Sequence, residues 1–153
     1  VRNEAIGGTT TWSTGQTMRS ALRHHRPRYV VIGLSPANDG LPGHPDFAEA
    51  IGDRFLSGLR ALADEAAAYP GVQSVILGGV YSHGKFTPAQ AAVLFRCARA
   101  MQTWPYPVID FLSAIDDGAG QWQKGMSADR FGAHPSAEGY HRMFQAINLS
   151  LFD

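Results

Sequence analysis

Residues 29–40 read YVVIGLSPANDG, and this stretch decides the fold class. Its first half, Tyr29–Leu34, is a short, continuously apolar run rich in β-branched side chains, which is typical of a strand buried on both faces. Its second half, Ser35–Gly40, consists mostly of residues that favour turns. The stretch therefore predicts a buried strand that ends in a polar loop. Runs of the same apolar kind at Val72–Gly78 and Pro107–Phe111 predict two more strands.

Helices are predicted between and after these strands. Asp46 has Glu49 three residues on, the spacing of a capping box. Thr87-Pro88-Ala89-Gln90 has the same capping-box spacing, with proline at the first helical position. The helix that begins there is expected to run to about Thr103. Another helix is expected over about Gly15–His25. The basic residues near its end are interpreted as a solvated helix end rather than a phosphate-binding patch.

The last helix is expected to start near Ser136. Its apolar side chains should point inward, and they are Tyr140, Met143, Phe144, Ile147 and Leu151. Alternating buried strands and amphipathic helices predict one three-layer α/β/α domain over residues 1–153, built on a parallel sheet. In such sheets a ligand binds at the carboxyl ends of the strands, which selects the loops after Leu34, Gly79 and Phe111 and the loop before the last helix.

Composition and charge exclude several classes of function. Lys+Arg and Asp+Glu each number 13, so the formal net charge is zero and the basic surface that nucleic-acid binding needs is missing. No stretch is long and apolar enough to span a bilayer. Cys97 is the only cysteine, which excludes an internal disulfide and a cysteine metal cage. The histidines other than His134 show no zinc-motif spacing, and of these only His44 and His83 lie in loops close to the expected cleft.

Three segments carry candidate chemistry. Asn3–Thr11 contains Gly7-Gly8 followed by hydroxyl residues, which either exposes backbone N–H groups to a ligand or forms an ordinary strand-to-helix turn. Asn38 either offers an amide to a developing oxyanion or belongs to a simple turn. His134 stands before a proline and a capping serine, so a rigid loop holds it at a helix N-terminus, as a general base requires. A fourth segment, Asp116–Trp122, is interpreted as a solvated turn rather than a cation site.

Taken in order, the first three segments resemble successive blocks of the SGNH/GDSL hydrolase superfamily. The resemblance assigns Gly8 and Asn38 to the oxyanion hole and His134 to the catalytic base. It implies a flavodoxin-like parallel sheet and an ester hydrolase that needs no metal or organic cofactor. The chain departs from the usual last block, because Phe131 stands where the family has aspartate. Either Asp129, five residues before the histidine, is the triad acid, or the enzyme relies on a Ser–His pair; Asp110 and Asp116 are weaker substitutes.

The block with the nucleophilic serine has no counterpart in the sequence. No Gly-Asp-Ser occurs, and Ser13, Ser35 and Ser82 stand in other contexts. The resemblance places the missing first strand inside the sheet, and opening the sheet there would cost more than the ~5–15 kcal/mol by which a domain is stable. We therefore expect the folded protein to include upstream residues with the serine, as a further segment or as another chain.

The expected activity is hydrolysis of acyl esters through a covalent acyl-enzyme. Short acyl groups, such as acetyl on a carbohydrate, are the substrates that the superfamily implies. Two alternatives stay open. One is an acyltransferase that uses the same residues, and the other is a non-catalytic SGNH-like carbohydrate-binding module. A small-molecule or carbohydrate ester is the expected partner, nucleic acid and a membrane span are not expected, and the oligomeric state stays open.

Overall fold

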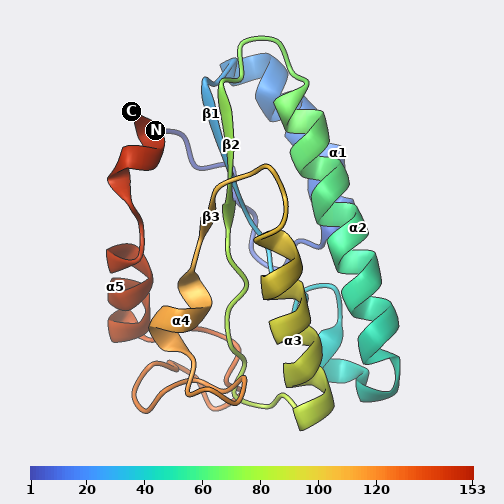
Figure 1. Cartoon of the computed structure of the whole chain (residues 1–153), viewed down its shortest axis with the longest axis vertical. Helices are drawn as coiled ribbons and strands as arrows, with labels where there is room; N and C mark the ends of the chain where they lie inside the picture. The colour runs from blue at the N-terminus through green and yellow to red at the C-terminus, as the bar shows by residue number, and fades with distance from the viewer.

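The computed structural model describes residues 1–153 and contains one parallel sheet (Figure 1). Its strands are β1 (Tyr29–Gly33), β2 (Ser74–Gly78) and β3 (Val108–Ile109), in the order β1-β2-β3. Val31 pairs with Ile76 and Gly78 with Ile109. All three predicted strands are confirmed. The third is shorter than expected because Phe111 already begins a helix.

Helices lie on both sides of this sheet. They are α1 (Thr11–His25), α2 (Ala48–Ala67), α3 (Pro88–Met101), α4 (Phe111–Ile115) and α5 (Ala137–Gln145). Short 3₁₀ turns cover Leu41–Gly43, Pro45–Phe47 and Leu149–Phe152. Figure 1 shows α1, α2 and α3 on one side of the sheet and α4 and α5 on the other, so the predicted α/β architecture is confirmed. No helix has the length and apolar character needed to cross a bilayer.

The main core fills the space between the sheet and the helices α2 and α3. Phe55 and Leu59 of α2, Leu77 of β2 and Leu94 of α3 are completely buried there. Each such side chain contributes about 1.5–3 kcal/mol when it leaves water. The buried residues of α2 recur at intervals of three and four positions, which is the spacing of one face of a helix; among them are Ile51, Phe55, Leu59, Leu62 and Ala66.

The opposite side of the sheet is much less covered. Val31 of β1 is 52% exposed, and Tyr140 and Phe144 of α5 are 58% and 64% exposed. The prediction that the last helix turns all its apolar residues inward is wrong for these two aromatic side chains. Met143 alone of the helix's large apolar residues packs against a buried cluster, that of Ile115, Trp122 and Met126. The reason is that α5 has no other element across from its outer face.

Two of the three helix caps predicted from the sequence are confirmed. Thr87 caps α3 in a capping box with Gln90, and Ser136 caps α5 by accepting a hydrogen bond from the Gly139 N–H at 3.1 Å. Asp46 does not cap α2. Pro45 starts a 3₁₀ turn that already contains Asp46, so α2 begins after Phe47 without a side-chain cap.

The N-terminal segment differs from expectation. Residues 1–8 are exposed and form no strand, so of the strand-to-helix turn considered for Asn3–Thr11 the structure contains only the turn at Gly7-Gly8 and the helix after it. A strand needs a neighbour for its backbone groups, and β1, at the edge of the sheet, pairs only with β2. Thr10 caps α1 instead, and α1 begins at Thr11, four residues earlier than predicted.

Candidate active site

The segment around Gly8 and the loop after β1 lie against each other. Gly8 has a φ of +78°, a conformation that favours glycine. A Cβ built on Gly8 would have no neighbouring atom within 4 Å. Asn38 stands in a turn in which its N–H donates to Ser35 O at 3.1 Å. The Asn38 Nδ2 donates to Thr9 O at 3.2 Å. Asn38 therefore contacts the residue that directly follows Gly8, so the structure brings the two predicted oxyanion residues close together.

A buried carboxylate braces the same two segments. Asp39, which is 7% exposed, accepts hydrogen bonds from the Thr11 hydroxyl at 2.8 Å and from the Thr11 N–H at 3.3 Å. The first turn of a helix has free N–H groups, so a carboxylate there is favourable. Arg54 of α2 donates to the Asp39 carbonyl oxygen at 2.6 Å and ties α2 to this junction. Asp39 was not predicted from the sequence to belong to the site, although it directly follows the candidate residue Asn38.

His134 and Asp129 form the second group of site residues. The His134 Nδ1 lies 2.6 Å from Asp129 Oδ2. The other carboxylate oxygen of Asp129 accepts the N–H groups of Phe131 and Ala133 at 2.8 and 3.1 Å. The hydrogen bond from His134, helped by the Ala133 N–H, lowers the pKa of Asp129 to about 2. Asp129 therefore stays ionised at neutral pH and holds the proton of the imidazole on Nδ1.

The remaining ring nitrogen of His134, Nε2, has no hydrogen-bond partner, and the side chain is 74% exposed. An imidazole fixed at Nδ1 by a carboxylate and free at Nε2 can accept a proton from a hydroxyl group. The five-residue separation in sequence is bridged by a tight loop in which Gly132 has a φ of +67°.

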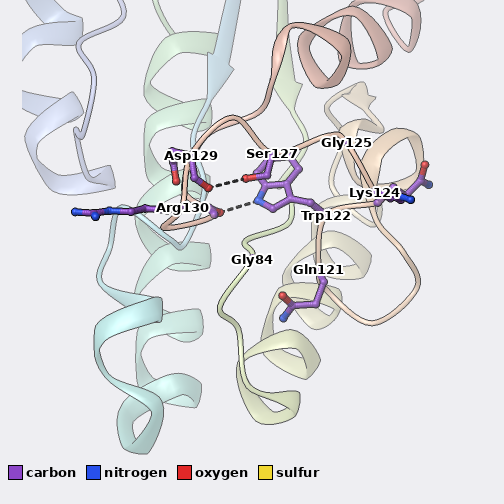
Figure 2. Close-up of a pocket in the computed structure, with 10 residues that line it drawn as sticks. Gly84, Gln121, Trp122, Lys124, Gly125, Ser127, Asp129 and Arg130 are labelled. Atoms are coloured by element: carbon purple, nitrogen blue, oxygen red, sulfur yellow. Dashed lines mark hydrogen bonds between the residues drawn. The ribbon is translucent and has the colours of Figure 1, made fainter.

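This loop is anchored to the rest of the molecule at Gly132. The Gly132 carbonyl oxygen accepts hydrogen bonds from the Gly84 N–H at 2.9 Å and from the Trp122 Nε1 at 2.6 Å. A Cβ on Gly132 would lie 2.6 Å from the Gly84 Cα, so only glycine fits. A cavity of about 350 Å³ lies here. Figure 2 shows Trp122 and Asp129 among the residues that line it, with the side chains of Lys124 and Arg130 extending away from one another.

His83, in the loop after β2, lies close to the same pair, as its position in the sequence predicts. Burial lowers the pKa of His83, and the negative charge of Asp129 opposes this effect only in part. Its Nδ1 accepts the Lys85 N–H at 3.2 Å, so the neutral ring carries its proton on Nε2. His83 therefore adds a neutral hydrogen-bond donor near Asp129 and His134.

The alternative acids and the serines within the chain have other partners. Asp110 caps α4 by accepting the Ser113 N–H and hydroxyl, and Asp116 accepts the Ser82 hydroxyl at 2.6 Å. Neither carboxylate contacts His134. The serines considered from sequence do not reach the imidazole either, because Ser35 and Ser82 are completely buried and Ser13 belongs to the cap of α1.

The geometry thus defines an α/β protein with a His–Asp pair and an amide-bearing loop at the carboxyl ends of its strands. The model of the GDSL-like lipase/acylhydrolase family matches residues 1–142, and the chain belongs to this family. It is of the ester hydrolase class. The chain matches no curated protein.

Solved structures of bacterial proteins share the fold. A candidate acylhydrolase of Bacteroides fragilis superposes with a TM-score of 0.70 at 24% identity, over 95% of this chain and 71% of that one. A GDSL-like lipase of Bacteroides thetaiotaomicron gives 0.71 at 20% identity, over 95% and 72%. An acetylxylan esterase of Geobacillus stearothermophilus gives 0.68 at 17% identity, over 99% and 71%. Catalytic mutants of that esterase replace a serine, an aspartate and a histidine by alanine.

Proposed function

We propose that the protein hydrolyses short-chain acyl esters of carbohydrates, with His134 as general base and Asp129 as the acid that orients it. The observation that carries the proposal is the short Nδ1–carboxylate contact that leaves Nε2 free. Gly8 N–H and the Asn38 amide would stabilise the oxyanion, a contribution of about 3–4 kcal/mol per donor in comparable sites. The acetylxylan esterase among the structural neighbours supports an acetylated sugar as substrate.

The reaction follows from these roles. His134 Nε2 takes the proton of a serine hydroxyl while its oxygen attacks the ester carbonyl carbon. The tetrahedral oxyanion collapses, the carbon–oxygen bond to the alcohol breaks, and the imidazolium returns its proton to the leaving alkoxide. Water then attacks the acyl-enzyme carbonyl carbon while His134 Nε2 takes its proton. The bond to the serine oxygen breaks, the imidazolium returns the proton to that oxygen, and the carboxylic acid leaves. If a second alcohol replaces water, the same residues perform acyl transfer.

We further propose that the serine comes from residues outside 1–153 that pair with β1. Backbone groups at the free edge of β1, which pairs only with β2, favour an added strand there. A parallel strand beside β1 would end at the same edge as Asn38. The alternative, a non-catalytic binding module, is favoured by one observation, namely that none of Ser13, Ser35 and Ser82 donates to His134.

The test is turnover of p-nitrophenyl acetate by the intact protein that contains residues 1–153. His134→Ala should reduce turnover to the background rate, whereas His141→Ala, a replacement of an exposed histidine on α5, should leave it unchanged. Undiminished turnover in His134→Ala would remove His134 from the mechanism. If the intact unmodified protein hydrolyses neither p-nitrophenyl acetate nor any of several acetylated sugars, the binding module is favoured.

A further inference from the structure

A groove runs between α1 and α2, apart from the cavity at the His134 loop. Its volume is about 630 Å³, within the range of ~300–1,000 Å³ that is typical of small-molecule sites. Small residues line it where the two helices approach, including Gly15, Gly58 and Ala61. The helices meet closely, since a Cβ on Gly58 would lie 2.6 Å from the Thr11 hydroxyl oxygen.

Trp12 forms one wall of the groove. It stands in the first turn of α1 and is 74% exposed, whereas Trp122 is 8% exposed. A single exposed apolar residue is ordinary on a protein surface. An indole beside an open groove is different, because its flat face offers a large, rigid and apolar contact at small entropic cost.

The other walls supply hydrogen-bonding groups of both kinds. Arg54 donates one hydrogen bond to the Asp39 carbonyl oxygen, which leaves most of its guanidinium N–H groups available. Ser57 adds an exposed hydroxyl. Glu65 offers carboxylate oxygens that Arg19 holds from the side, with Nη2 at 3.2 Å from Oε2.

This combination selects the chemistry of a ligand. The lining carries two carboxylates, Asp39 and Glu65, against the Arg54 guanidinium, and Arg19 pairs with Glu65, so these charges balance and favour a neutral ligand. The polar walls disfavour a bare acyl chain. A neutral pyranose ring has an apolar C–H face for the indole and hydroxyl groups for Arg54 and Glu65. The groove therefore fits a neutral oligosaccharide best.

Two residues that line the groove are close in sequence to the proposed oxyanion residues. Thr10 follows Gly8 by two residues, and Asp39 follows Asn38 by one. The Asn38 bond to Thr9 O fixes these loops together. We propose that the groove between α1 and α2 binds the neutral sugar portion of the substrate, with one pyranose ring stacked on Trp12. Its role in catalysis rests on the proposed function, but sugar binding itself does not.

The test is an NMR titration of the intact protein that contains residues 1–153, labelled with ¹⁵N, with xylotriose and separately with cellotriose. Residues 1–153 contain three tryptophans, whose indole N–H signals report on three places. Trp12→Phe assigns the first by its disappearance. The Trp12 signal should shift and saturate with at least one sugar, while the signals of Trp104 and Trp122 stay in place.

Variants make the result specific. Trp12→Ala should weaken sugar binding at least ten-fold. Ala61→Gln, at an exposed helix position, places a longer uncharged side chain across the groove and should also weaken binding. Phe144→Ala removes an exposed aromatic ring from α5 and should bind sugar as the unmodified chain does.

No shift of the Trp12 signal with either sugar would overturn the proposal, and so would a shift of Trp122 instead, which would place the sugar at the His134 loop. Unchanged affinity in both groove variants would overturn it as well. The outcome is separable from esterase activity. Sugar binding without ester hydrolysis would keep the groove and reject the proposed function, and hydrolysis without binding at Trp12 would do the reverse.

Discussion

The two pairs of site residues are held in different ways. Asp129 and His134 are joined by a charge-assisted hydrogen bond, and their loop is anchored through Gly132 to Gly84 and Trp122. Gly8 and Asn38 are joined only through the Thr9 carbonyl oxygen, and both are exposed. Residues 1–153 alone thus assemble the pair proposed as base and acid. The pair proposed for the oxyanion hole lies next to the exposed N-terminal segment.

The largest effect is expected from Asp129→Asn. The amide keeps the shape of the side chain but no longer favours the tautomer with the proton on Nδ1, so kcat of the intact protein should fall about 10⁴-fold. The matched control is Asp110→Asn, which changes a carboxylate that caps α4. A fall of less than ten-fold in Asp129→Asn would mean that the enzyme relies on a Ser–His pair.

Asn38→Ala should have the next largest effect. Loss of one oxyanion donor lowers kcat about 10²–10³-fold with little change in KM, because the donor acts mainly on the transition state. Steady-state kinetics on p-nitrophenyl acetate measure this split. A rise in KM with unchanged kcat would show that Asn38 binds the ground state and not the oxyanion.

A pair of glycine variants compares the rigidity of the two regions. Gly132→Ala combines a positive φ with a contact of 2.6 Å to Gly84, and it should lower the free energy of unfolding by about 2–4 kcal/mol. Gly8→Ala has a positive φ in open space and should cost about 1–2 kcal/mol. Urea denaturation of both variants measures the difference. Equal losses would contradict the assignment of the Gly132 loop as the more constrained region.

The smallest effect is a pH dependence. The pKa of Asp129 is about 2 in the folded protein and ~3.9 in the unfolded chain, so this carboxylate stabilises the fold above pH ~4. The contribution is lost as the pH falls through 2. The ¹³C shift of the Asp129 carboxyl should therefore titrate near pH 2, and the midpoint should rise in His134→Ala. A midpoint near 3.9 in the unmodified protein would show that the hydrogen bond to His134 does not form.

Local signals in the sequence predicted most of the fold. The apolar runs at Tyr29–Leu34 and Val72–Gly78 contain β1 and β2, and Thr87 and Ser136 cap helices as expected. These features depend on a few neighbouring residues. The exposure of Phe144 does not, because it is decided by what lies opposite α5. Asp46 failed as a cap because Pro45 began a 3₁₀ turn one residue earlier.

The candidate site was only partly predictable. The sequence predicted three alternative acids for His134, namely Asp129, Asp110 and Asp116. The five-residue spacing from Asp129 to His134 differs from the usual pattern of the family. The positive φ of Gly132 closes a loop that brings Asp129 to the imidazole, and a five-residue spacing alone does not reveal this turn. The brace between Asp39 and Thr11 joins residues 28 positions apart, so only the folded chain shows it.

The most direct test of the central claim is covalent labelling of the intact protein with a fluorophosphonate, followed by peptide mapping. The reagent reacts with serines that a neighbouring base activates. We expect one labelled serine, outside residues 1–153, and no labelling in His134→Ala. A label on Ser13, Ser35 or Ser82 would contradict the proposed origin of the nucleophile. A label of undiminished yield in His134→Ala would contradict the role of His134.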